Sequence, residues 1–160
     1  MPIHAYLGLK GKTMGVISKI SKEGDEDDIR VYRIDHQLVH PIDPENGQPS
    51  GKRRHMPLRI CKKIDKFSPL LYEALTKAEQ LECDIKLYHW ESGTETHYFS
   101  IKLKKSLISS IKVFEAVALD PAQEELDPME EISFSYDTIA WKHEPTGREH
   151  EDGWKLVGRA

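Results

Sequence analysis

The sequence predicts an antiparallel all-β domain, either a β-barrel or a two-sheet sandwich, with one short α-helix packed on the outside. Most of the chain alternates apolar and polar residues with the two-residue period of a half-buried strand. Short turn segments rich in glycine and polar residues separate the alternating stretches. Only one stretch, beginning at Ser68, changes to the three- and four-residue spacing of an amphipathic helix.

The composition is that of an ordinary globular domain. The chain has 160 residues, of which 38% are apolar and 31% charged, a length that suits one domain with its own core. A net charge of −4 argues against nucleic-acid binding. The first ten residues acquire charge too soon for a secretory signal, and no apolar run is long enough to span a bilayer. We expect no membrane insertion, no conventional leader, and free thiols at Cys61 and Cys83.

The N-terminal part is expected to form strands. Residues Ile3 to Leu9 alternate as a first strand, and the segment GVISKI is a candidate for a second, shorter one. The acidic run Asp25 to Asp28 lacks the ligand spacing of a calcium loop and is expected to be solvated. Ile29 to His40 is predicted to be one long strand. Its apolar side would carry Tyr32, Ile34 and Leu38.

A connection of unusual length, Pro41 to Arg54, comes next. It contains three prolines and two glycines, and long connections of this kind are often functional. After an alternating strand that includes Met56, Leu58, Ile60 and Ile64, Ser68 and Pro69 are expected to start the helix, with Ser68 as its N-cap. The helix should cover the sheet with a stripe made of Leu70, Leu71, Leu75 and Ala78.

The rest of the chain is predicted to consist mainly of strands. Asp84 to Glu91 and Thr96 to Lys105 form a hairpin around Ser92-Gly93-Thr94, and Ser106 to Ala118 continues as strand. After the acidic segment 119–128, Met129 to His143 alternates almost without fault. The expected single domain covers residues 1–160, with a core of about 1–143 and a C-terminal tail or edge strand over 144–160.

No group of side chains indicates catalysis, a metal site or a cofactor. Two of the eight histidines, His36 and His40, are four residues apart, but on a strand this separates them by about 13 Å. The chain has no HExxH, CxxC, GxSxG, GxGxxG or P-loop motif. We therefore expect a protein that is not an enzyme. One polar face remains of interest, because it is either an ordinary solvent face or a basic stripe that meets a polyanion; it consists of Ser100, Lys102, Lys104 and Lys112.

Several segments together resemble one protein family. They are IHAYLGLKG near the N-terminus, the block DHQLVHPIDPENGQPSGKRRHMPLRICKKIDKFSPLLYEAL, the strand YFSIKL, and EEISFSYDTIAW followed by DGW. These segments, and above all the middle block, resemble the Hcp (haemolysin-coregulated protein) family of bacterial type VI secretion systems. The resemblance extends over nearly the whole chain.

The resemblance implies a structural subunit of a secretion tube. Such subunits form hexameric rings that stack into a tube, which a contractile sheath drives out of the cell behind a VgrG-type spike. Some members hold small effector proteins in the lumen of the ring. The protein would thus be cytoplasmic at first and extracellular after secretion, with no cofactor and no nucleic-acid partner. A stand-alone ligand-binding β-barrel, or a small hydrolase acting alone, is the alternative.

Two surfaces are candidates for function within this resemblance. The loop after the second long strand is expected to reach a neighbouring subunit or ring, with Lys52, Arg53 and Arg54 pairing with acidic residues there. The stripe of Lys102 and Lys104 is expected to face the lumen and acidic cargo. The full loop surface consists of Pro44, Glu45, Asn46, Gly47, Gln48, Pro49, Ser50, Gly51, Lys52, Arg53 and Arg54.

Overall fold

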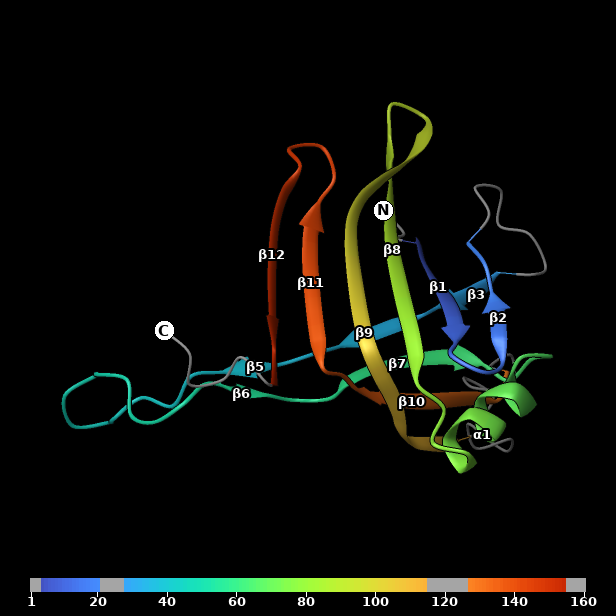
Figure 1. Ribbon diagram of the computed structural model, residues 1–160. Helices are drawn as coiled ribbons and strands as arrows, with labels where there is room; N and C mark the ends of the chain where they lie inside the picture. Colours follow the sequence, from blue (N-terminus) through green and yellow to red (C-terminus); the bar gives the residue numbers. More distant parts are fainter. Residues whose placement is uncertain (1–3, 21–27, 115–126, 155–160) are drawn as a thin grey trace, which may run out of the picture.

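Two antiparallel sheets make up the fold, and the long strand β9 (Thr94–Phe114) runs through both (Figure 1). The computed structural model describes residues 4–20, 28–114 and 127–154. Lys105, with φ of 49°, separates the half of β9 that belongs to the first sheet from the half that belongs to the second. The predicted all-β class is confirmed, and of the two architectures left open the sandwich is the one observed.

The first sheet contains the longer strands, and its inner face supplies half of the core. Leu7 and Ile85 lie opposite each other in it, and both side chains are fully buried. The predicted hairpin is confirmed, with a turn at Ser92 and Gly93. Of the segment 144–160, expected to be a C-terminal tail or an edge strand, Arg148–Gly153 form a strand that pairs with Thr138–His143. Besides β9, this sheet contains β1 (His4–Gly11), β2 (Gly15–Ser18), β3 (Ile29–Val31), β8 (Leu81–Glu91), β11 (Thr138–His143) and β12 (Arg148–Gly153).

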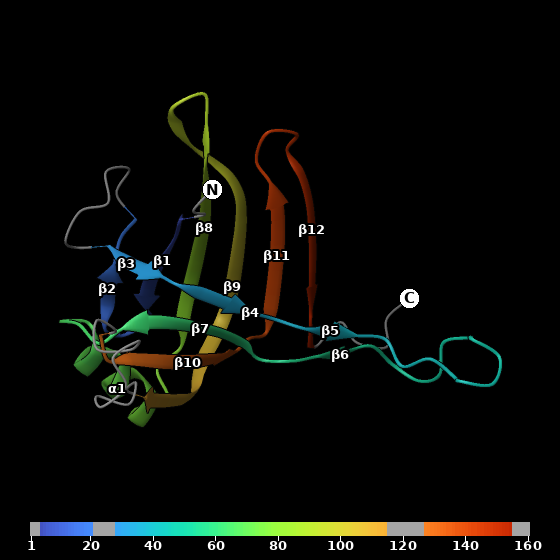
Figure 2. The same ribbon diagram turned by 180° about the vertical axis from the view of Figure 1, so that it is seen from behind.

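The second sheet lies across the first and closes the other side of the core. Ile132 pairs with Ile60 on one side and with Ile111 on the other, so apolar residues stand in register across the sheet. Its strands follow the order β9, β10 (Met129–Ser135), β7 (Leu58–Lys63) and β4 (Arg33–Asp35). A separate two-stranded ribbon of β5 (Leu38–Val39) and β6 (Arg54–His55) leads away from it (Figure 2).

The prediction of one long strand over Ile29 to His40 is wrong. The chain forms β3, β4 and β5, which pair with β1, β7 and β6 respectively. The predicted faces are also wrong at the crossing point, because Val31 is buried and Tyr32 is exposed. Met129 to His143 is likewise divided into β10 and β11, one in each sheet. Alternation along the chain does not indicate where a strand changes its pairing partner, because the partner is distant in sequence.

The helix α1 (Ser68–Thr76) is confirmed, but its start differs from the prediction. Phe67 is the N-cap residue, without a side-chain capping bond, and Ser68 already lies inside the helix. The covering side also shifts: Leu71 is fully buried, whereas Leu70 is exposed. No helix within the described ranges is long and apolar enough to cross a membrane. The acidic run Asp25 to Asp28 lies largely outside these ranges, as does the segment 119–128 apart from its last residues.

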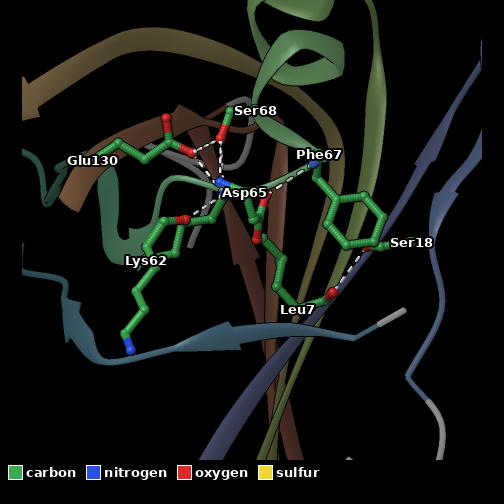
Figure 3. A network of polar contacts seen from close by, with 8 residues as sticks. Leu7, Ser18, Lys62, Asp65, Phe67, Ser68 and Glu130 are labelled. Carbon is green, nitrogen blue, oxygen red and sulfur yellow. Dashed lines mark hydrogen bonds and ion pairs between the residues drawn. The ribbon is translucent and has the colours of Figure 1, made fainter. Parts of the chain in front are cut away.

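Ser68 joins a buried network of charged groups beneath the helix (Figure 3). Its hydroxyl donates to Glu130 Oε1 at 2.8 Å and accepts the amide hydrogen of Asp65 at 3.0 Å. The ammonium of Lys62, a fully buried side chain, lies 2.6 Å from Glu130 Oε1 and 2.9 Å from Asp65 Oδ1. A lysine thus occupies a position of β7 on the same face as the buried Leu58 and Ile60, and paired carboxylates compensate its charge.

Both cysteines are buried free thiols, as predicted. Cys61 lies on β7 in the second sheet, and Cys83 lies on β8 in the first. Burial raises the pKa of the Cys83 thiol to about 12. A thiol with such a pKa is a poor nucleophile at neutral pH, so this cysteine acts as a small apolar residue.

Candidate assembly surfaces

The long connection forms an arm that projects from the sandwich (Figure 2). Its tip is folded by its own hydrogen bonds: the amide of Asp43 donates to the carbonyl of Gln48, and the amide of Gly47 donates to the carbonyl of Asp43, each at 2.8 Å. Gly47 has φ of 70°, a conformation that glycine adopts at little cost. Every residue from Pro44 to Lys52 is exposed. The arm therefore has a defined shape without being part of the core.

A buried charged network fixes the root of the arm to the edge strand β12. Arg53 binds the carboxylate of Asp152 with two hydrogen bonds, Nε to Oδ2 at 2.6 Å and Nη2 to Oδ1 at 2.8 Å. Nε2 of His55, a fully buried side chain, lies 2.9 Å from Asp152 Oδ2. Nδ1 of His55 and Nε2 of His36 each lie 2.8 Å from the hydroxyl oxygen of Tyr136. The orientation of the arm thus depends on residues about 100 positions away in the chain.

The surroundings shift the pKa values of four of these groups, and the hydrogen bonds to Asp152 raise the pKa of Arg53. The hydrogen bonds from Arg53 are the main cause that holds the pKa of the Asp152 carboxyl far below its usual range. Burial raises the pKa of Tyr136 and lowers that of His36, where the nearby His55 adds to the effect. Asp152 is accordingly charged and His36 neutral at pH 7, the states that this network favours.

The expected loop surface is only partly available to another molecule. The guanidinium of Arg53 is already bound by Asp152 of its own chain. This partner could not be predicted from the local pattern, because Asp152 lies in the C-terminal segment. Lys52 and Arg54 are exposed, and neither forms an ion pair within the described ranges. Within the expected loop surface, Lys52, Arg54 and the exposed tip are therefore the parts accessible to another molecule.

The expected basic stripe is divided by the structure. Lys102 and Lys104 are exposed on the outward face of the first sheet, where Lys104 Nζ lies 3.5 Å from Glu151 Oε1. Ser100 is only 2% exposed, and its hydroxyl donates to Glu144 at 2.7 Å. Lys112 lies beyond the bend of β9, in the second sheet. Ser100 and Lys112 therefore do not belong to a surface with Lys102 and Lys104.

The two lysines that do share a surface border a shallow groove. It has a volume of about 530 Å³ and runs over β1, β2, β8 and β9. Its positive side chains outnumber the negative ones, so it suits an anionic partner. The charged residues of the groove are Lys10, Lys19, Lys86, Lys102, Lys104, Glu82 and Asp84.

Comparison with known protein families identifies the chain. A family model described as "Type VI secretion system effector, Hcp" matches residues 6–143. The chain belongs to the Hcp family. The "Major exported protein" of Pseudomonas aeruginosa PAO1 is 34% identical to it over 167 residues, which cover 97% of each chain.

Solved Hcp structures share the fold. A structure named "Crystal structure of Hcp protein" has a TM-score of 0.87 and 30% identity, covering 96% of this chain and 98% of the other. Hcp1 of the E. coli EAEC 042 pathovar, in a mutant form, has a TM-score of 0.81 and 28% identity, covering 96% and 99%. As an Hcp protein, the chain is a structural tube protein of type VI secretion and not an enzyme.

Proposed function

We propose that this Hcp chain assembles into hexameric rings that stack into a tube, which a contractile sheath expels from the cytoplasm together with a VgrG-type spike. The observation that carries the proposal is the agreement with the Hcp family in both sequence and fold along nearly the whole chain. The exposed arm adds support, because a structured projection without a role in its own core suits a contact with another copy.

The groove beside Lys102 and Lys104 supports a second part of the proposal, the carriage of small effector proteins. In a ring whose lumen this groove lines, its excess positive charge would attract acidic cargo. Charge reversal by Lys102→Glu with Lys104→Glu is expected to reduce the export of an acidic effector. Unchanged export, or burial of both side chains between subunits, would contradict this role.

The direct test is the state of the purified protein. Native mass spectrometry should give a mass of six chains, and negative-stain electron microscopy should show rings with a central opening. A monomer at every concentration would contradict the tube proposal, and a monomer that binds a small ligand in a deep apolar cavity would favour the stand-alone binding protein.

A further inference from the structure

The tip of the arm carries the only asparagine of the chain, and a glycine follows it directly. Asn46 and Gly47 are both exposed in the projecting loop between β5 and β6 (Figure 2). Apart from the neighbours of Gly47 in the chain, no described residue has an atom within 4 Å of the place where its Cβ would stand. The backbone amide of Gly47 thus lacks the steric shielding that a side chain gives. Nothing hinders its approach to the side chain of Asn46.

A hydrogen bond within the tip prepares the side chain of Asn46 for attack. Its Oδ1 accepts the amide hydrogen of Gln48 at 2.8 Å. Negative charge develops on this oxygen when a nucleophile adds to the side-chain carbonyl, so the bond lowers the barrier to addition. The same bond folds the side chain forward over the main chain, where the next amide nitrogen is that of Gly47.

We propose that Asn46 is a site of spontaneous deamidation, which converts the neutral residue at the tip of the arm into an anionic one. The deprotonated amide nitrogen of Gly47 attacks Cγ of Asn46, and the Cγ–Nδ2 bond breaks with release of ammonia, leaving a cyclic imide. Water then opens the imide at either of its carbonyl carbons. One opening gives aspartate, and the other gives isoaspartate, in which the main chain runs through Cγ. The net reaction consumes one water and releases one ammonia.

A second hydrogen bond of the tip opposes the reaction. The amide of Gly47 donates to the carbonyl of Asp43 at 2.8 Å, so this bond must open before the nitrogen can lose its proton. The bond lies within the arm, and its opening leaves the sandwich intact. One bond of ordinary strength should slow the reaction by about 2- to 10-fold relative to the unfolded chain. A site protected by the whole fold would react roughly 1,000-fold more slowly or less.

Another pair that can form a cyclic imide, Asp152 and Gly153, is protected by the fold. Asp152 is 7% exposed, and Arg53 and His55 hold its carboxylate. Gly153 is buried too, and a Cβ there would collide with the carbonyl oxygen of Asp137. The carboxyl group cannot turn toward the amide of Gly153 without breaking the network at the root of the arm. We expect Asp152 to form isoaspartate only when the whole protein unfolds, so it serves as an internal control.

Deamidation would change both the charge and the shape of the tip. The new carboxylate joins those of Asp43 and Glu45, and these like charges repel one another. Isoaspartate also lengthens the main chain by one CH2 group, so the hydrogen bonds between residues 43 and 48 no longer fit. Because the arm is proposed to contact another copy, aged chains should assemble less well. That consequence rests on the proposed function, whereas the reaction itself does not.

Peptide mapping of protein aged in water enriched in oxygen-18 tests the reaction. The peptide that contains residue 46 should exchange its NH2 for an OH that carries the heavy oxygen, with more isoaspartate than aspartate. The rate should rise about tenfold for each unit of pH, because the fraction of deprotonated amide does so. Asn46→Gln is the matched control and should stay unchanged, because the longer side chain closes a ring less readily.

The rates in the native and the urea-unfolded chain decide the outcome. Asn46 should react at most about 10-fold more slowly in the native protein, whereas Asp152 should form isoaspartate only in urea. Slowing at Asn46 of more than about 30-fold would overturn the inference if it occurs both in the unmodified protein and in Lys52→Glu with Arg54→Glu, where no neighbouring copy should cover the tip. Slowing in the unmodified protein alone would support the inference and show that a copy covers the tip. A protein that deamidates at Asn46 but stays monomeric at every concentration would contradict the proposed function alone.

Discussion

The molecule contains two buried networks of charged side chains, and they hold different parts in place. The first joins Lys62, Glu130 and Asp65 where the helix meets the second sheet, inside the sandwich. The second joins Arg53 and Asp152 at the root of the arm, outside the main core. Both networks contain short ion pairs. Only the first connects core elements, namely β7, β10 and the segment that leads into α1.

The two networks differ in what they control, which is the stability of the fold for the first and the position of the arm for the second. Loss of a partner in the first network leaves a fully buried ammonium with only one carboxylate to compensate its charge, a cost that unfolding relieves. Loss of a partner in the second leaves a guanidinium that can turn toward water, since Arg53 lies nearer the surface. We therefore expect the first network to control folding and the second to control where the arm points.

The largest effect is expected for Glu130→Gln. Removal of this charge leaves Lys62 with only the partly exposed Asp65 as its carboxylate partner, and breaking a buried pair costs about 3–5 kcal/mol of unfolding free energy. Urea denaturation followed by circular dichroism measures the loss. Glu131→Gln, at the next residue of β10, is the control and should change stability by less than about 0.5 kcal/mol. Equal losses of unfolding free energy in the two variants would show that the first network does not stabilise the fold more than an ordinary carboxylate of β10 does.

Asp152→Asn should reduce the free energy of unfolding less than Glu130→Gln does, but it should loosen the root of the arm more. A hydrogen bond to a charged group is worth about 1.5–3 kcal/mol, and the amide keeps part of the bonding to Arg53 and His55. The substitution should increase the rate of hydrogen exchange more in the ribbon of β5 and β6 than in β7. Faster exchange throughout the protein would instead place this network in the folding core.

Acid should weaken the arm network before the sandwich. The pKa of His36 is lowered by burial, so its contribution to stability is complete above the ordinary value of 6.5 and shrinks as the pH falls below it. The lowered pKa of Asp152 acts with the same sign, but its contribution is complete above 3.8 and is lost only in stronger acid. Stability should thus fall between pH 7 and pH 5, and His36→Asn should remove most of this fall. A variant with an unchanged pH profile would exclude His36 as the cause.

The smallest effect on stability is expected for the exposed part of the arm. Lys52→Glu with Arg54→Glu should change the unfolding free energy by less than about 0.5 kcal/mol, because both side chains are exposed and unpaired within the described ranges. Assembly into rings or stacks should nevertheless be reduced in native mass spectra. Lys12→Glu with Arg59→Glu makes the same change of charge at exposed positions elsewhere and should assemble normally. Equal assembly of both double variants would remove the arm from the contact.

The candidate site was only partly predictable from the sequence. The arm was visible as a long connection rich in proline and glycine, because such a segment cannot continue a strand. The binding of Arg53 by Asp152 was not visible, since the two residues come together only when β12 pairs with β11. Ser100 has the same parity as Lys102, so the pattern predicts the same exposed face for both, but Glu144 covers Ser100. The burial of Ser100 thus depends on Glu144, which follows the partner strand β11 and is distant in sequence.

By itself, the sequence determined the β-rich class, the place of the single helix, the β8–β9 turn and the family. These follow from local period, turn residues and a specific block of residues, all of which are properties of neighbours along the chain. Only the tertiary structure decided that residues 29–40 divide between two sheets, that β9 belongs to both, and that Lys62 is a core residue. The physical reason is that strand pairing and charge compensation join residues far apart in the chain, so an identical local pattern is compatible with several partners.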